Sequence, residues 1–206
     1  MYEDIDENKR KELRTRELAE TDPLTGVLNR AAFAARTDQI IHSSKADAKH
    51  TLLMMDIDGF KLVNDAFGHE AGDRTLIDVA NALRSVLRRD DIVGRLGGDE
   101  FVVFMNDIPS DAVAANKAKQ ICALMRKVYS LEVQTSGSVG IAMFPRDGSD
   151  FDTLYKKADS ALYHVKGSGK DNYSFYHEKM EDERRRSTMS CPKPPENPKR
   201  TKSAVC

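Results

Sequence analysis

The sequence predicts an α+β fold, in which helices pack on the faces of a central sheet. Residues 50–57 (HTLLMMDI) are apolar on both faces, as expected of a central strand that is covered on both sides. Further along, Gly97-Gly98-Asp99 separates two short apolar runs, which is the pattern of a β-hairpin. Helical segments alternate with these strands, so the predicted element order is βααββαβαβ after a lead-in helix.

The helices are predicted from caps and apolar spacing. Asn29 is placed to cap a helix that runs to about Ile41, and a helix follows the central strand. Apolar residues from Leu76 to Leu87 repeat at helical spacing, which predicts an amphipathic helix over 70–88. The remaining predicted elements are a helix marked by apolar residues over 118–128, a strand over 135–144, a helix over 151–165 and a last strand over 172–176.

The 206 residues suffice for one domain with tails. Residues 1–20 are dense in charge and read as an exposed helix or a linker. Residues 21–178 form the expected domain. Residues 179–206 are basic and contain prolines, which predicts a disordered tail.

Composition excludes several classes of protein. The formal net charge is -1, which gives no global attraction to nucleic acid or to an anionic membrane, so neither is expected as a partner. Cys122, Cys191 and Cys206 are scattered, which argues against a disulfide framework and a zinc site and favours a reducing cytoplasm. The charged N-terminus lacks a signal-peptide pattern, and no long apolar run predicts a membrane span.

The central strand ends on acids, in the stretch Asp56-Ile57-Asp58. Magnesium usually takes one or two carboxylates together with phosphate oxygens, and Asp56 is placed to supply one of them. The alternative is that these acids cap the helix that follows, as is common for an isolated Asp-x-Asp.

The hairpin carries a second pair of acids, Asp99 and Glu100, at its tip. The glycines before them permit a tight turn and let a ligand approach the backbone closely. Taken alone, this segment could be only a polar turn.

Together these segments resemble the GGDEF family of diguanylate cyclases. The resemblance covers about residues 21–176, in five ordered blocks. The matching segments are Asp22 to Arg30 (DPLTGVLNR), Asp56 to Asp73 (DIDGFKLVNDAFGHEAGD), Gly97 to Phe101 (GGDEF), Thr135 to Phe144 and Ala158 to Asn172 (ADSALYHVKGSGKDN).

The resemblance implies a palm-like fold related to nucleotidyl cyclases, with a mainly antiparallel sheet. Its activity would be the condensation of two GTP molecules into cyclic di-GMP across an antiparallel homodimer. Asp56, the carbonyl of Ile57 and Asp99 would hold one or two Mg²⁺ or Mn²⁺ ions. Asp99 would accept the proton, and Glu100 would support the metal site.

The resemblance also implies the substrate-binding residues. Asn64 and Asp73 would read guanine, whose N1–H and N2–H a carboxylate can accept, with His69 at a matching position. The alternative for Asp73 is an acid favoured by a helix N-terminus. Lys61, Lys166 and Lys170 would bind phosphates. Lys170 departs from the arginine that is frequent in the family, which bears on triphosphate affinity because a point charge replaces a bidentate fork. Gly59 also departs from the larger residue that is common at its position.

Arg88 and Asp91 match the RxxD motif that binds the product as a feedback inhibitor in many members of the family. The alternative is that Arg88 is only a cation favoured by a helix C-terminus.

Two other functions stay open. One is a catalytically silent module that senses GTP or cyclic di-GMP, although silent members usually have a degraded signature. The other is a cyclase that makes a mixed GMP/AMP dinucleotide, against which Asp73 argues, because that activity goes with serine there.

Overall fold

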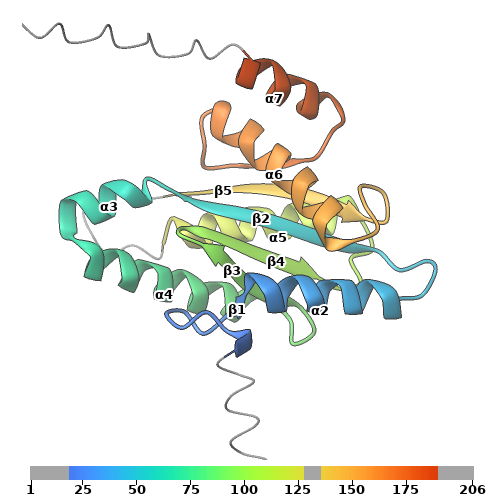
Figure 1. The fold of residues 1–206 in the computed structure, drawn as a ribbon, viewed down its shortest axis with the longest axis horizontal. Helices are drawn as coiled ribbons and strands as arrows, with labels where there is room; N and C mark the ends of the chain where they lie inside the picture. The colour runs from blue at the N-terminus through green and yellow to red at the C-terminus, as the bar shows by residue number, and fades with distance from the viewer. Residues whose placement is uncertain (1–18, 128–135, 190–206) are drawn as a thin grey trace, which may run out of the picture.

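The computed structural model describes residues 19–127 and 136–189, which form a six-stranded sheet with helices on its faces (Figure 1). The strands are β1 (Leu28–Asn29), β2 (His50–Asp58), β3 (Ile92–Gly97), β4 (Glu100–Met105), β5 (Ser136–Phe144) and β6 (Tyr173–Phe175). The helices are α2 (Arg30–Ser43), α3 (Phe60–Phe67), α4 (His69–Val86), α5 (Asp111–Met125), α6 (Phe151–Gly167) and α7 (Lys179–Met189). From β2 to β6 this order confirms the prediction.

Strand β2 is the centre of the sheet, whose order is β1-β3-β4-β2-β5-β6. All nine of its residues are buried, which explains why its sequence is apolar on both faces. It pairs antiparallel with β4 and β5, β3 pairs antiparallel with β4, and only the outer pairs β1–β3 and β5–β6 are parallel. The predicted palm-like, mainly antiparallel α+β fold is therefore confirmed.

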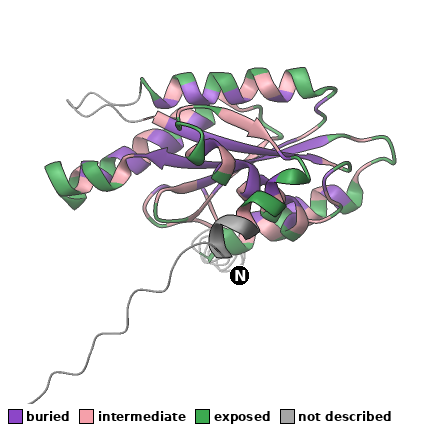
Figure 2. Cartoon of the chain, turned by 90° about the horizontal axis from the view of Figure 1, so that it is seen from above, coloured by how far each residue is buried: buried purple, intermediate pink, exposed green. Residues whose placement is uncertain are grey.

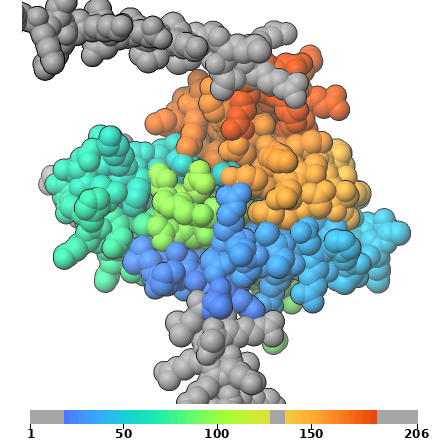
Figure 3. Space-filling model, viewed as in Figure 1, coloured from blue at the N-terminus to red at the C-terminus, as the bar shows by residue number. Residues whose placement is uncertain are grey.

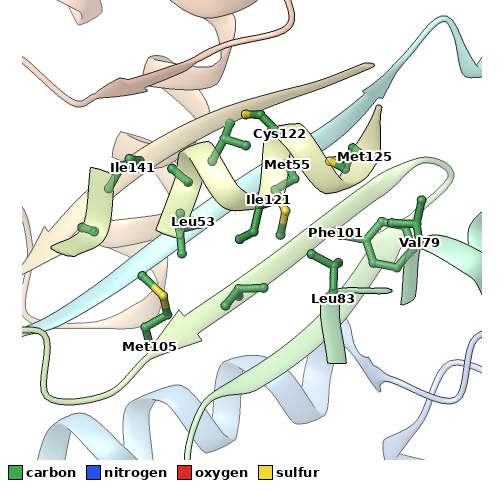
Figure 4. Close-up of a cluster of buried hydrophobic side chains, with 14 of the residues drawn as sticks. Leu53, Met55, Val79, Leu83, Phe101, Met105, Ile121, Cys122, Met125 and Ile141 are labelled. Carbon is green, nitrogen blue, oxygen red and sulfur yellow. The ribbon is translucent and has the colours of Figure 1, made fainter. Parts of the chain in front are cut away.

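The alternation of side chains along β2 divides the core between the two faces of the sheet. Leu53, Met55 and Ile57 pack with α4 and α5, and part of this cluster is drawn in Figure 4. Leu52 and Met54 pack on the other face with α2 and α6. In Figure 2 the strands are largely buried, while the helices expose one side to solvent.

Local signals fix where the helices begin. The side chain of Asn29 accepts a hydrogen bond from the backbone N–H of Ala32, as predicted, and Asp150 caps α6 in the same way through Thr153. Only Gly68 separates α3 from α4, and its φ of 83° lies in the left-handed region that favours glycine. This sharp junction folds α3 back onto α4.

Helix α7 differs from the prediction of a disordered tail over 179–206. It lies against α6 (Figure 1). Met180 and Tyr176 are buried with Ala161, and Arg184 Nη1 lies 2.5 Å from Asp159 Oδ2. The rest of that predicted tail, and nearly all of the predicted N-terminal helix or linker, lie outside the described residues. Among the described helices, none has the length and apolar character that crossing a membrane requires.

Candidate active site

The two predicted acidic clusters meet at one end of the sheet. Asp56, near the end of β2, is directly opposite Glu100, the first residue of β4, and Asp99 lies in the two-residue turn that precedes Glu100. Figure 3 shows the hairpin region around residue 100 at the surface, between the segment of α3 and α4 and that of α6. The antiparallel β2–β4 register therefore converts a separation of more than forty positions in sequence into a single site.

Asp56 has an unusual electrostatic environment. Its side chain is 11% exposed, and its Oδ2 lies 2.6 Å from Nζ of Lys166. Burial raises the pKa of Asp56 to about 6; the charges of Asp99 and Asp58 also raise it, while Lys166 opposes the rise. The site thus concentrates more negative charge than Lys166 neutralises.

Glu100 is in a similar position. Burial raises its pKa above the ordinary value, and the carboxylates of Asp159 and Asp99 add to that effect, while Lys166 and Arg30 act in the opposite direction. A cation placed among these acids would relieve the repulsion between them.

An arginine that the sequence analysis did not single out fixes the hairpin turn. Nε and Nη2 of Arg95 donate to the carbonyl of Gly98 at 2.9 and 2.8 Å, and Nη1 lies 3.1 Å from both carboxylate oxygens of Asp22. Asp22 also accepts hydrogen bonds from Thr25. Burial alone would raise the pKa of Asp22, but the hydrogen bonds from Thr25 and Arg95 outweigh it and hold the pKa below its ordinary value. Asp22 and Arg95 thereby anchor the turn that carries Asp99.

The helix-capping alternative for the acids at the end of β2 is wrong. The N-cap of α3 is Gly59, and no side chain caps that helix. Asp58 instead accepts from Ser136 and Ser138 of β5 and from the backbone N–H of Asp171. Asp58 therefore has a structural set of partners, whereas Asp56 faces the site.

The structure brings Asn64 and the N-terminal half of α4 together. A Cβ added at Gly72 would lie 1.9 Å from Oδ1 of Asn64, so the Asn64 side chain keeps this place against α4 because residue 72 is glycine. Asp73, the next residue, is exposed and lies beyond the first turn of α4, where the acid is Glu70. A role for Asp73 as an N-terminal helix acid is thus less favoured.

The remaining expected ligand residues surround this region. Lys61 lies in the first turn of α3 and His69 begins α4, and both are exposed. Lys166 ends α6 beside Asp56, and Lys170 lies in the loop that follows, with a φ of 64°. Gly59 has a φ of 79°, so glycine suits this position.

Arg88 and Asp91 form a turn between α4 and β3. The backbone N–H of Arg88 donates to Oδ2 of Asp91 at 2.9 Å, and that of Asn106 donates to Oδ1 at 3.1 Å. The side chain of Arg88 is exposed one residue beyond the C-cap Leu87, and the basic residue in the last turn of α4 is Arg84. Asp91 therefore stabilises the turn, and Arg88 projects from it.

The donor set suits a hard divalent cation bound together with phosphates. In the ranges 19–127 and 136–189, no three His, Cys, Asp or Glu side chains converge as a ready-made metal cage. Magnesium needs no such cage, because it uses one or two carboxylates plus substrate phosphates. The buried carboxylate of Asp56 and the partly exposed carboxylate of Asp99, whose charges interact, fit that requirement.

Comparison with known proteins gives one consistent result. The family model described as "Diguanylate cyclase, GGDEF domain" matches residues 19–172. The bifunctional diguanylate cyclase/cyclic di-GMP phosphodiesterase MucR of Pseudomonas aeruginosa is 40% identical over 80% of this chain, and the cyclic di-GMP phosphodiesterase PdeR of Escherichia coli is 38% identical over 86%. The chain spans only 24% and 27% of these two proteins, about a quarter of their length.

Solved structures agree with this match. The GGDEF domain of TpbB from Pseudomonas aeruginosa superimposes with a TM-score of 0.76 at 32% identity, covering 80% of this chain and 99% of that one. The GGDEF domain of DgcB from Caulobacter crescentus, solved in complex with c-di-GMP, gives a TM-score of 0.69 at 27% identity and covers 76% and 95% of the two chains.

Proposed function

The chain belongs to the GGDEF family of diguanylate cyclase domains, and on that premise we propose that it condenses two GTP molecules into cyclic di-GMP and two pyrophosphates. The observation that carries the proposal is the convergence of Asp56, Asp99 and Lys166 at one end of the sheet. Carboxylates that repel one another beside a lysine suit a metal-bound triphosphate.

Asp56, Asp99 and the backbone carbonyl of Ile57 would hold one or two Mg²⁺ or Mn²⁺ ions. The β2–β4 ladder ends at Asp56 and Glu100, which leaves the β4 side of Ile57 outside the ladder. When bound, the metal supplies Lewis-acid activation of the 3′-oxygen and neutralises charge on the α-phosphate. Asp99 takes the proton of the attacking hydroxyl, and Glu100 supports the metal site.

The base and the phosphates would be bound on opposite sides of these acids. The amide of Asn64 can both donate to and accept from the guanine edge, and the carboxylate of Asp73 accepts from the N1–H and N2–H donors, which adenine lacks. Lys61, Lys166 and Lys170 bind the triphosphate, with His69 alongside. Lys166 then exchanges its contact with Asp56 for a contact with phosphate.

Each domain holds one GTP, so the reaction needs two copies of the chain that face each other in an antiparallel homodimer. The accumulated product binds Arg88 and Asp91 and slows the reaction. The c-di-GMP complex of the DgcB domain supports a product-binding role for such a domain.

A silent module that senses GTP or cyclic di-GMP is the second candidate, because PdeR, named only as a phosphodiesterase, is 38% identical. The intact Gly97 to Phe101 signature argues against it, and Asp73 argues against a mixed GMP/AMP product.

Product analysis separates these functions. The purified chain is incubated with Mg²⁺ and either GTP alone or an equal mixture of GTP and ATP, and the products are identified by mass spectrometry. We expect cyclic di-GMP and pyrophosphate from both mixtures. Nucleotide binding without a product would support the silent module, and a mixed dinucleotide would contradict the role of Asp73.

A further inference from the structure

The loop after α6 has a demanding backbone conformation. Gly169, Lys170 and Asp171 follow one another with φ values of 116°, 64° and 51°, all in the region that disfavours side chains. Such a run of left-handed residues persists only where its surroundings hold it in place. Because Lys170 lies in the middle of the run, whatever holds the loop also sets the direction of that lysine.

Asp171 ties the loop to β2 and α5, while within the loop the backbone N–H of Lys170 donates to the carbonyl of Val165 at 3.1 Å. The backbone N–H of Asp171 donates to Oδ2 of Asp58 at 3.2 Å. Its carboxylate oxygens both lie 2.8 Å from Nε of Arg126, and Nη2 of Arg126 donates to its carbonyl at 3.4 Å. The next residue, Asn172, accepts from the N–H of Val139 at 2.9 Å and leads into β6.

Asp58 is itself fixed from the other side. It is 6% exposed, and its carboxylate accepts from Ser136 Oγ at 2.8 Å and from Ser138 Oγ at 2.9 Å. Both serines belong to β5, which pairs with β2 along the whole length of β2. With several donors around its oxygens, Asp58 links β2, β5 and the loop.

We propose that Asp58, assisted by Arg126, is a positioning residue that holds the loop of Lys170 so that this lysine meets the triphosphate. The inference rests on the proposed function, because it assumes that the nucleotide binds beside Lys166 and Lys170. Asp58 contacts no reacting atom in this account and acts through the amide of Asp171.

The sign of the effect distinguishes positioning from simple charge. A carboxylate near an anionic triphosphate repels it, so removing the charge alone would strengthen nucleotide binding. Loss of the loop anchor would weaken it. Asp58→Ala and Asp58→Asn remove the same charge, but only the asparagine retains an oxygen that can accept from Asp171.

Affinity for a non-hydrolysable GTP analogue, measured by calorimetry with Mg²⁺, tests the proposal. We expect Asp58→Ala to bind at least about fivefold more weakly than the parent, and Asp58→Asn to stay within about twofold of it. In a Lys170→Ala background the Asp58→Ala effect should disappear, because the loop then has no lysine to direct. Equal or tighter binding by Asp58→Ala, or the same loss with and without Lys170, would overturn the positioning role.

Arg126 provides a variant that should fold, because its side chain is 52% exposed. Arg126→Ala should weaken binding of the analogue by about two- to fivefold, as suits an exposed ion pair, while Lys127→Ala, which removes the neighbouring exposed cation, should not. If Arg126→Ala and Lys127→Ala weakened binding of the analogue equally, Arg126 would act only through its positive charge, which would contradict its assigned role. A parent chain that binds no guanine nucleotide would overturn the proposed function itself. Variants that bind the nucleotide as tightly as the parent would overturn only the positioning role.

Discussion

Nζ of Lys166 lies 2.6 Å from Oδ2 of Asp56, so the expected phosphate ligand is paired with the expected metal ligand. This ion pair gives the buried carboxylate a partner, but the pKa of Asp56 is still raised to about 6 because burial outweighs the lysine. The site is therefore electrostatically strained in favour of binding a cation.

Stability without metal should depend on the ionisation of Asp56. The unfolded carboxyl releases its proton near pH 3.8 and the folded one near pH 6, so the folded state holds more protons between these values. Its contribution to the free energy of unfolding should fall as pH rises through this window, by up to about 3 kcal/mol.

Urea unfolding of the metal-free parent and of Asp56→Asn at pH 4 and pH 7 checks this. The free energy of unfolding of the parent minus that of Asp56→Asn should be lower at pH 7 than at pH 4. A difference that is independent of pH would show that Asp56 ionises normally.

Gly72→Ala should disturb guanine binding more than it disturbs the fold. The added Cβ would lie 1.9 Å from Oδ1 of Asn64, and the end of that side chain can move aside. We expect a rise in KM for GTP of about tenfold, since a displaced hydrogen bond is worth about 0.5–1.5 kcal/mol and the neighbouring Asp73 shifts with it.

Steady-state kinetics together with thermal unfolding test the Gly72 variant. A parental KM would place the nucleotide away from α3 and α4. If Tm dropped strongly while the folded molecules kept the parental kcat and KM, Gly72 would serve only the packing of α3 and α4.

Arg95→Ala should release the turn that carries Asp99, because one guanidinium bonds both Asp22 and the carbonyl of Gly98. We expect kcat to fall and stability to drop by about 1–3 kcal/mol, because the partly buried Asp22 loses its cation. Arg95→Lys should lie between parent and alanine, because a single ammonium cannot reproduce the fork. A lysine variant no better than alanine would argue that the fork geometry decides, and a fully active alanine variant would refute the anchoring role.

Product inhibition should depend on the side chain of Arg88. Arg88→Ala should leave the initial rate nearly intact but prevent the slowing that follows as cyclic di-GMP accumulates. Arg89→Ala, which removes the adjacent exposed cation, should slow as the parent does. Progress curves with added product measure this. Asp91 is a poorer probe, because its carboxylate also holds the backbone of Arg88 and Asn106.

The sequence was sufficient to predict elements with strong local signals. The buried run of β2, the Asn29 cap and the glycine turn of the hairpin each carry their own physical cause, and each is confirmed. Helix α7 could not be predicted, because its charged sequence has little apolar periodicity and its observed contacts, such as Arg184 with Asp159, are tertiary. The two-residue strand β1 is too short to leave a pattern.

The same distinction applies to the site. The acids of both clusters were found because they stand in motifs, and the β2–β4 register brings them together. Arg95 and Asp58 were not assigned a role, because a single Arg or Asp has no signature until folding brings Gly98 or Asp171 to it. Long-range hydrogen bonds of this kind depend on topology and not on local sequence.

We propose that Asp99 works with Asp56 in metal-assisted catalysis and that the fold does not need the charge of Asp99. Asp99→Asn should lower the rate of cyclic di-GMP formation by a factor on the order of 10²–10³ or more. Its Tm should equal or exceed that of the parent, because the charge of Asp99 raises the pKa of Asp56 and so opposes its ionisation. Asp47→Asn, the same change at an exposed position in the turn before β2, serves as the control. The test measures the initial rate with GTP and Mg²⁺, together with thermal unfolding, for the parent, Asp99→Asn and Asp47→Asn. The predicted result is an Asp99→Asn variant that is inactive but fully folded. An Asp99→Asn variant that makes cyclic di-GMP at the parental rate would contradict the account.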